Sequence, residues 1–354
     1  MRISVVVGLA AILCTAGPGA FAQEKSLSIT LTGQSMIRSD IRATAPAAVP
    51  AIKALIQGDV NFTNFEGSVF APGQSVAQGR GFLAPAAALD ALKSFGFNLL
   101  SLSNNHAFDL KAAGLANTLK AVNERGLVHA GIGNNLAEAS APAYLKAGDA
   151  TVALVASASG LMAPGARATE TSGGVNELRI EAGTQQNEAR QELPALPGNQ
   201  PDKEDAARIL GSIRQARAHA DVVIVYQHNH VFDNRPFSAL FSEGLPARLA
   251  PPAWLKKWVH AEIDAGADIV VMHGAPLLHG VEIYRGKPIF YDLGNFIYNL
   301  PPAITYIDEP INWESVVANV KFQGLRLQSV SLRPIAMNNV GKGQPDVHDE
   351  HTNT

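Results

Sequence analysis

The chain has 354 residues, a formal net charge of −3 at pH 7 and 47% hydrophobic residues. This nearly balanced charge argues against binding to nucleic acid or to an anionic membrane surface, and the length is sufficient to bury a large core. The only cysteine is Cys14, so a disulfide, a thiolate nucleophile and a cysteine-based zinc site are excluded for the rest of the chain.

The N-terminus has the pattern of an export signal. Arg2 precedes the apolar run ISVVVGLAAIL, and an A-x-A sequence ends at Ala22. The apolar run is shorter than the ~20 residues that span a membrane comfortably. We therefore expect a signal peptide at residues 1–22, cleavage after Ala22, and a periplasmic or secreted protein without a stable membrane span. The alternatives are an uncleaved anchor and lipidation of Cys14.

The first half of the remaining chain alternates strand-like and helix-like segments. Short apolar runs or apolar–polar alternation indicate strands, and apolar residues every three or four positions indicate helices. The expected elements are a strand at 27–34, a helix at 47–57, a strand at 59–66, a helix at 84–95, a strand at 97–103, a helix at 111–125, and strands at 128–133 and 151–159. This alternation is typical of an α/β fold.

The second half resumes the same rhythm after a polar stretch at 181–204, which we interpret as a surface excursion. The expected elements are a helix at 203–219, a strand at 221–230, a helix at 252–265, a strand at 266–274, two strands joined by a hairpin turn at 285–287, and further strands at 315–334. We expect a single domain at 23–340 and a flexible polar tail at 341–354.

Four segments carry His, Asn, Asp or Glu side chains near the ends of apolar strands. They are NFTNFEG at 61–67, SNNHAFD at 103–109, YQHNHVFD at 226–233 and VVMHG at 270–274. Oxygen and imidazole donors of this kind bind hard or borderline divalent cations. Each segment alone could equally be a turn whose polar side chains hydrogen-bond within the turn. Their recurrence predicts one shared site, because ligand sites in α/β folds gather at the carboxyl ends of strands.

Other catalytic patterns are missing from the sequence. There is no G-x-S-x-G nucleophile motif, no P-loop and no dinucleotide-binding glycine pattern after the first strand. The string GIGNN at 131–135 is interpreted as a structural turn, and HDEH at 348–351 as part of a solvated tail.

Longer motifs resemble a known family. They are NFEG at 64–67, SLSNNHAFDLKAAGL at 101–115, QHNH at 227–230 and HGAPLLHGVEIYRGKPIFYDLGNFIY at 273–298. On these residues, and over about residues 27 to 335, the chain resembles the CapA, or poly-γ-glutamate capsule biosynthesis, family of the metallophosphatase-like superfamily. The resemblance implies a four-layer α/β/β/α sandwich like that of calcineurin-type phosphoesterases.

The resemblance also implies roles for particular residues. His106 would be the catalytic proton donor, and Asp109 would orient it. The implied metal ligands are Glu66, Asn105, His228 and His273. The implied supporting or substrate-binding residues are Gln34, Asn64, Asn104, His230 and Asn295.

Two positions depart from the family pattern. Gln34 stands where an early carboxylate ligand is usual, and Pro276 stands where a second histidine is common. A pair of closely spaced metals needs such ligands. We therefore expect at most one divalent metal, Mn, Zn, Fe or Mg, and a site without metal is the alternative.

Two functions follow from these patterns. The first is an exported hydrolase or transferase that acts on a phosphorylated or acylated small substrate in capsule or envelope polymer synthesis. The second is a non-catalytic scaffold that binds an anionic polymer, within an envelope biosynthesis complex, through a degenerate metal site. A third interpretation is an envelope protein whose polar residues only stabilise turns.

Overall fold

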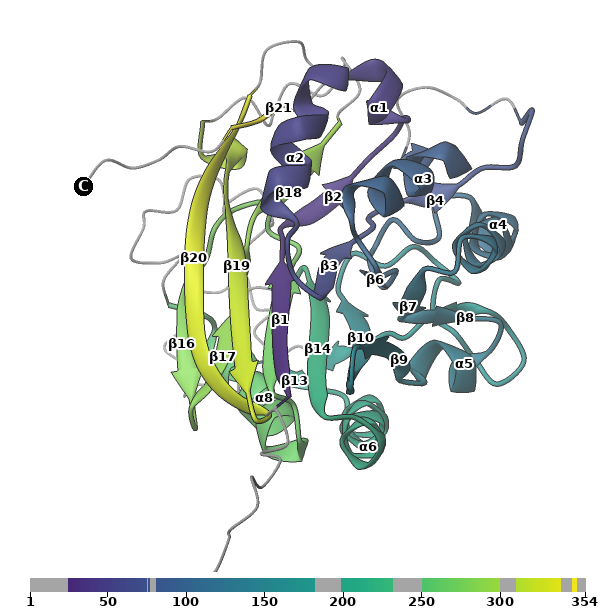
Figure 1. Cartoon of the computed structure of the whole chain (residues 1–354). Coiled ribbons are helices and arrows are strands. Elements are labelled where there is room, and N and C mark those ends of the chain that lie inside the picture. The colour runs from purple at the N-terminus through teal and green to yellow at the C-terminus, as the bar shows by residue number, and fades with distance from the viewer. Residues whose placement is uncertain are drawn as a thin grey trace, which may run out of the picture.

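The computed structural model describes residues 25–74, 76, 81–181, 199–231, 250–299, 310–338 and 346–348. Two β-sheets stack face to face, and helices cover the outer face of each sheet (Figure 1). This arrangement is the predicted four-layer α/β/β/α sandwich, so the fold prediction is confirmed. The expected signal peptide lies outside the described residues, and the boundaries of the single domain stay a prediction.

The first sheet has seven strands in the order β21-β20-β19-β1-β3-β6-β7. Their bounds are β1 (Ser26–Leu31), β3 (Val60–Asn64), β6 (Leu99–Ser101), β7 (Val128–Ala130), β19 (Glu314–Gln323), β20 (Arg326–Asn338) and β21 (Asp346–His348). The four strands from β1 to β7 are parallel, whereas β19, β20 and β21 are antiparallel to their neighbours. Parallel neighbours need crossover connections, which explains the alternation of strands and helices.

The second sheet has six strands in the order β16-β17-β15-β14-β10-β9. Their bounds are β9 (Ala143–Ala147), β10 (Ala150–Ser159), β14 (Val222–Asn229), β15 (Ile269–His273), β16 (Val281–Tyr284) and β17 (Lys287–Phe290). The central strands β10, β14, β15 and β17 are parallel. The predicted hairpin turn is present between β16 and β17, where Arg285 and Gly286 both adopt positive φ, as a tight two-residue hairpin requires.

Helices cover both sheets. The outer face of the first sheet packs against α1 (Ile41–Thr44), the 3-10 turn η1 (Pro46–Ala48), α2 (Val49–Leu55), α3 (Ala86–Phe95) and α4 (Lys111–Glu124). The outer face of the second sheet packs against α6 (Lys203–His219) and α8 (Ala253–Ala265). The short helix α5 (Leu136–Ser140) follows the GIGNN string, and the side chain of Asn135 caps its N-terminus.

Short strand pairs and one turn complete the described elements. They are β2 (Gln34–Met36) with β18 (Asn295–Tyr298), β4 (Ser68–Val69) with β5 (Leu83–Ala84), β8 (Ile132–Gly133) with β11 (Gly174–Val175), β12 (Ile180–Glu181) with β13 (Gln200–Pro201), and the 3-10 turn η3 (Pro310–Trp313).

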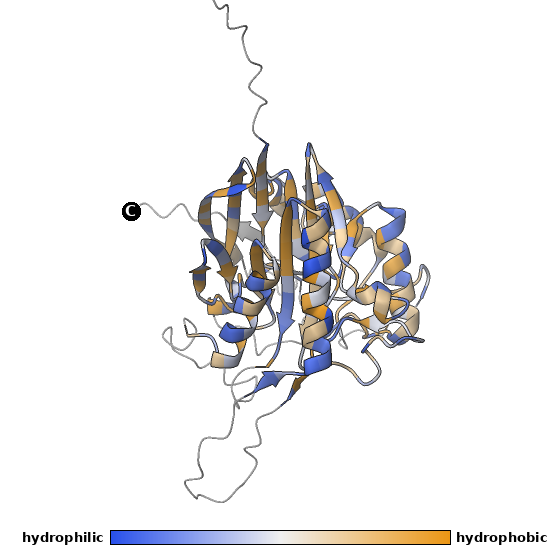
Figure 2. Ribbon diagram, turned by 90° about the horizontal axis from the view of Figure 1, so that it is seen from below, coloured by the Kyte–Doolittle hydropathy of each residue, from blue (hydrophilic) through white to orange (hydrophobic). Residues whose placement is uncertain are grey.

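The central core lies between the two sheets. Alternate residues of the facing strands, such as Ile29 and Phe62 in one sheet and Ile224 and Tyr226 in the other, are at most 1% exposed. The rings of Phe62 and Tyr226 meet with centroids 5.5 Å apart. In Figure 2 the strands are largely hydrophobic, whereas the helices carry both hydrophilic and hydrophobic residues. The central strands of each sheet are therefore buried on both faces, whereas edge strands such as β9 and β16 are partly exposed, and each helix buries one side.

Two local features differ from the sequence-based expectations, and a third lies outside the described residues. The first strand ends at Leu31, and Gln34 begins a separate strand that pairs with β18. Residues 346–348, inside the expected flexible tail, form β21 because the edge of β20 offers free backbone hydrogen-bonding groups. Residues 182–198, most of the expected surface excursion, lie outside the described part. Among the described helices, none is both long enough and apolar enough to cross a membrane.

A buried ion cluster fixes the start of α6. Asp205 is fully buried, and its carboxylate accepts hydrogen bonds from Arg167 at 2.6 and 2.8 Å, from Arg179 at 2.8 Å and from Arg208. Burial acts to raise the pKa of Asp205, but the hydrogen bonds from the three arginines hold it well below its ordinary value. The cluster therefore ties α6 to the loops before β11 and β12.

We predict that Asp205→Ala destabilises the protein by about 3 kcal/mol at pH 7, because it removes the buried carboxylate that pairs with the partly buried guanidinium groups of Arg167 and Arg208. The folded-state pKa is depressed, so the stabilisation is present above the unfolded-state value of about 3.9 and is lost as the pH falls below it. Urea denaturation at pH 7 and pH 3 measures both effects. Glu204→Ala, at a neighbouring side chain that is 91% exposed, is the matched control. Equal losses for the two variants at pH 7 would contradict the assignment.

Candidate functional site

The carboxyl ends of parallel strands from both sheets meet at one place in the fold. Glu66 follows β3, and the Asn105–His106 pair follows β6. His228 lies near the end of β14, and His273 is the last residue of β15, directly beside it in register. The predicted convergence of segments that are far apart in the sequence is therefore present.

His228 is the centre of the cluster. It is fully buried, and its Nε2 atom lies 2.9 Å from Asn105 Oδ1, 3.0 Å from His230 Nε2 and 3.8 Å from Glu66 Oε1. On the other side of the ring, Nδ1 lies 3.1 Å from the Tyr226 hydroxyl. The ring is thus held by Tyr226 and directs Nε2 at three other polar side chains.

His106 and Asp109 form a hydrogen-bonded pair beside this centre. His106 Nδ1 lies 2.8 Å from Asp109 Oδ2, and its Nε2 lies 3.9 Å from Glu66 Oε1. The backbone N–H of Phe82 donates to the same Asp109 oxygen, which fixes the carboxylate. Burial acts to lower the pKa of His106, but the Asp109 hydrogen bond and the Glu66 charge outweigh it and raise this pKa. The side chain keeps 23% of its surface exposed, so Nε2 can reach a bound molecule.

Asn104 shapes the loop that presents these groups. It is fully buried, and its Nδ2 donates to Phe65 O at 2.9 Å and to Asn64 Oδ1 at 3.2 Å. Its Oδ1 accepts the backbone N–H of His106 at 3.1 Å. Asn64 and Asn104 therefore join the ends of β3 and β6 and position the loop. This role does not require either side chain to contact His228.

Gln34 and Asn295 bond to each other. Gln34 Nε2 donates to Asn295 Oδ1 at 3.0 Å, across the β2–β18 strand pair. Asn295 Nδ2 donates in turn to Asn312 O at 3.1 Å. Gln34 Oε1 is buried and has no hydrogen-bond partner among the residues that the structure describes. The two amides thus form a neutral pair at the position where the resemblance led us to expect a carboxylate.

His273 is close to the cluster, but its ring nitrogens form no hydrogen bond with another side chain among the described residues. Its ring packs against Tyr226 with centroids 5.5 Å apart, and neither ring nitrogen makes a hydrogen bond of normal geometry within the described residues. Burial lowers the pKa of His273 to about 3, although the Thr32 backbone acts in the opposite direction. Burial also lowers the pKa of His230 to about 3 and that of His228 well below its usual range. These imidazoles are therefore neutral at pH 7.

Close backbone packing fixes the spacing between the two histidine strands. Gly274 follows His273 with φ of 130°, and a Cβ atom added there would collide with the backbone oxygen of Asn229. Only glycine is suited to this conformation and this contact. The ends of β14 and β15 are thereby held together at the site.

Glu66 is the buried carboxyl group of the cluster. Burial raises its pKa to about 7, the charge of His106 acts to lower it, and the charge of Asp109 acts to raise it. Its Oε2 atom is buried and has no hydrogen-bond partner in the described part of the chain. An uncompensated buried carboxylate is costly, so a cation next to Glu66 would stabilise its charged form.

The donor atoms around His228 fit one divalent cation. Ligands bound at about 2.1 Å lie roughly 3 to 3.5 Å from one another, and His228 Nε2 lies close to this separation from Asn105 Oδ1, at 2.9 Å, and from His230 Nε2, at 3.0 Å. Neutral imidazoles and a carboxylate are the forms that bind metal. Counting only His, Cys, Asp and Glu, the described residues contain no group of three or more that could hold a metal ion. A cation here would therefore depend on the amide oxygen of Asn105.

Three residues near the site were not predicted from the sequence. The guanidinium of Arg38 lies 5.6 Å from the centre of the Phe82 ring. Burial lowers the pKa of Arg38, and the charge of Asp109 acts in the opposite direction. Tyr226 holds the ring of His228, as described above. Asp292 is buried and accepts the N–H of Gly294 at 2.7 Å, and burial raises its pKa well above the ordinary value. Asp292 could have been found from the sequence, because it directly precedes the LGNF motif at 293–296. No sequence pattern marks Arg38.

The chain is similar in sequence to a described protein family and to several individual proteins. The model of the family described as bacterial capsule synthesis protein PGA_cap matches residues 28–300. Uncharacterized protein y4sH of Sinorhizobium fredii (strain NBRC 101917 / NGR234) is 30% identical over 322 residues, which cover 70% of this chain and 67% of the relative. PGA biosynthesis protein CapA of Bacillus subtilis (strain 168) is 29% identical over 210 residues, and capsule biosynthesis protein CapA of Bacillus anthracis is 29% identical over 214 residues.

The alignments with the two CapA proteins cover 59% of this chain but only 44% and 42% of those relatives. Among solved structures, a phosphatase of Mycoplasma pneumoniae aligns over 89% of this chain and 95% of its own, with a TM-score of 0.49 and 9% identity. The NAD nucleotidase NadN of Haemophilus influenzae aligns over 91% of this chain and 53% of its own, with a TM-score of 0.40 and 10% identity. From the family match over residues 28–300, the chain belongs to the bacterial capsule synthesis protein family PGA_cap.

Proposed function

We propose that the protein is an exported, metal-dependent hydrolase or transferase that acts on an anionic substrate in capsule or envelope polymer synthesis. One observation carries this proposal: neutral His228 and His230, the Asn105 oxygen and buried Glu66 converge beside the His106–Asp109 pair. Export is inferred from the N-terminal sequence pattern, and the role in envelope synthesis from the family.

His106 is the proposed proton donor. Its Nδ1 bonds to Asp109, so the ring orientation is fixed and Nε2 carries the proton that can be transferred. The raised pKa of His106 keeps a larger fraction of the ring protonated near neutral pH, which suits a general acid. Asp109 does not touch the reacting atoms in this proposal but holds the ring in position.

Arg38 is the proposed anchor for the negative charge of the substrate. It forms no ion pair with any residue that the structure describes, although Nη1 donates to Gly81 O. A guanidinium group binds the oxygens of a carboxylate or phosphate with two parallel hydrogen bonds. The proposed substrate is therefore a phosphorylated or acylated small molecule, or a unit of an anionic polymer, with Arg38 on its charged group.

Glu66, Asn105, His228 and His230 would hold the cation. When bound, a divalent metal polarises a phosphoryl or acyl oxygen of the substrate and so favours attack at that centre. The chain itself supplies the ligand atoms, the proton at His106 Nε2 and the partly buried surroundings that strengthen these interactions.

A non-catalytic scaffold is the second candidate, and the Gln34–Asn295 pair favours it. This neutral pair replaces an acidic group near the site, which reduces both the number of metal ligands and the repulsion of an anion. A scaffold should bind its polymer equally well with and without a chelator, and after His106→Ala. An enzyme should lose activity under both conditions.

We predict that the purified mature protein binds about one divalent cation and that His228→Ala abolishes this binding, because the central ligand is lost. Elemental analysis after dialysis against Mn²⁺, Zn²⁺, Fe²⁺ or Mg²⁺ measures the content. His219→Ala, at the end of α6, is the control and should retain the metal. A wild-type protein that stays metal-free with all four ions would rule out the metal-dependent mechanism.

We predict that His106→Asn lowers kcat about 10²- to 10⁴-fold, because the general acid is removed. Hydrolysis of a generic phosphodiester in the presence of Mn²⁺ measures the effect. The variant should keep its metal content, since the proposed ligands are untouched, and His219→Asn serves as the control. An unchanged kcat for His106→Asn, with activity lost in His228→Ala, would show that another group donates the proton.

We predict that Arg38→Gln raises KM about tenfold and changes kcat less, because it removes an interaction with the charged group of the substrate and leaves His106 in place. Steady-state kinetics with the same phosphodiester separate the two constants. Arg42→Gln is the control, since Arg42 pairs with Asp40 at the surface of the neighbouring helix. A fall in kcat at constant KM would contradict the anchoring role.

A further inference from the structure

Four buried side chains form a hydrogen-bonded series on the outer face of the six-stranded sheet, and we call it the outer-face network. Trp258 Nε1 on α8 donates to Gln227 Oε1 at 2.8 Å, and Gln227 Nε2 donates to Ser159 Oγ at 3.0 Å. The Ser159 hydroxyl donates in turn to Asn229 Oδ1 at 2.8 Å. Each of the four residues is at most 4% exposed, so breaking one bond leaves a buried polar atom without its partner.

The outer-face network ends at the backbone that carries His230. Asn229 Oδ1 also accepts the N–H of Val231 at 3.3 Å, and Asn229 Nδ2 donates to Val231 O at 3.0 Å. The N–H of His230 itself donates to Ser159 O at 2.8 Å. Because His230 lies just beyond the end of β14, these bonds determine where its backbone lies.

The outer-face network and the histidine cluster lie on opposite faces of β14. Successive side chains of a strand point to opposite faces, so Val225 packs under the helices and Tyr226 packs between the two sheets. In the same way Gln227 contacts α8, whereas its neighbour His228 points at Asn105. The network therefore reaches the cluster through the backbone at the end of this strand.

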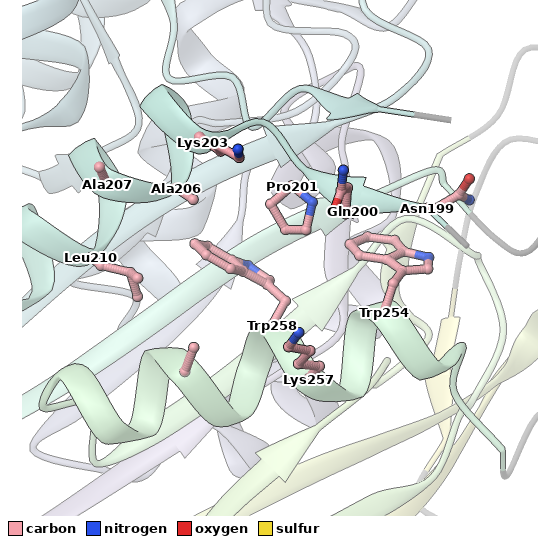
Figure 3. Close-up of a pocket in the computed structure, with 11 residues that line it drawn as sticks. Asn199, Gln200, Pro201, Lys203, Ala206, Ala207, Leu210, Trp254, Lys257 and Trp258 are labelled. Carbon is pink, nitrogen blue, oxygen red and sulfur yellow. The ribbon is translucent and has the colours of Figure 1, made fainter. Parts of the chain in front are cut away.

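Trp258 is the member of the network that comes from a helix. Its ring lines a pocket of about 610 Å³ between α6 and α8, together with Trp254 and Leu210 (Figure 3). Empty space beside a ring removes packing partners on that side. The hydrogen bond to Gln227 therefore contributes more to the orientation of this ring than it would in a fully packed core.

Two buried groups beside the network provide matched comparisons. Trp254 lies one turn before Trp258 on α8, and its indole N–H has no hydrogen-bond partner among the described residues. Ser157 lies two positions before Ser159 in β10, and its hydroxyl also has no partner in the part of the chain that the structure describes. Each residue thus has the same chemistry as a network member but lacks its bond.

We propose that the outer-face network positions the ring of His230 beside His228, at the spacing that a shared cation needs. The two Nε2 atoms lie 3.0 Å apart. The network residues are positioning residues, because they act through the backbone and not on the reacting atoms. The proposal rests on the proposed function, since it takes His230 as a ligand of the cation. Loss of bonds that orient a ligand typically weakens metal binding about 10- to 100-fold.

The test measures Mn²⁺ binding by calorimetry in two matched pairs of variants. Trp258→Phe and Ser159→Ala each remove a bond of the network, whereas Trp254→Phe and Ser157→Ala make the same changes outside it. We expect the first two variants to bind Mn²⁺ about tenfold more weakly and the two controls to bind it like the wild type. Ser159→Ala removes a single oxygen atom, so it tests the network even if Trp258→Phe does not fold.

A second measurement does not depend on a metal. In the metal-free protein at pH 7, the NMR signals of the His228 and His230 rings should shift in Trp258→Phe and Ser159→Ala and stay in place in the two controls. If the wild type binds no cation but these signals shift as expected, the metal-dependent function fails and the positioning role stands. Unchanged ring signals in both network variants would overturn that role, and so would equal losses of Mn²⁺ affinity in each variant and its control.

Discussion

The contact between His228 and Asn105 is the interaction on which the site depends. His228 belongs to the six-stranded sheet and Asn105 to a loop after the seven-stranded sheet, and the two atoms that meet are 123 residues apart in sequence. The contact exists because both sheets bury their inner faces against each other and so fix the relative position of their strand ends. Each donor is held in place by a neighbouring side chain. The Tyr226 hydroxyl bonds to the ring of His228, and Asn104 bonds to the backbone of the loop that carries Asn105.

Burial gives this site its chemical character. Removing imidazoles from water favours their neutral form, and removing a carboxyl group from water favours its protonated form. His228 and Glu66 show opposite shifts from the same cause, whereas His106 is shifted the other way because Asp109 bonds to it. The cluster thus combines neutral nitrogen donors, an acid group that a cation would ionise, and one histidine whose pKa is raised by its carboxylate partner. These are the components that the proposed metal-assisted hydrolysis or transfer would use.

Much of the fold could be predicted from local patterns. Apolar strands and amphipathic helices alternate in the sequence, and the donor residues follow the strands, so the convergence of Glu66, Asn105 and His228 followed from the rule that parallel strands end at one edge. The bond between Gln34 and Asn295 could not be predicted, because it joins residues 261 positions apart through a register that only the packed sheets define. Arg38 was also missed, since its surroundings come from a loop without a periodic signal.

The glycine at 274 has a consequence for how this protein could change. Because its missing side chain lets β15 approach Asn229, the gap between the two histidine strands is set by main-chain atoms. The width of that gap therefore does not depend on which side chains the two strands carry. Because this spacing is set by the backbone, single substitutions of the polar side chains beside it should change the chemistry of the site and leave the separation of the two strands as it is.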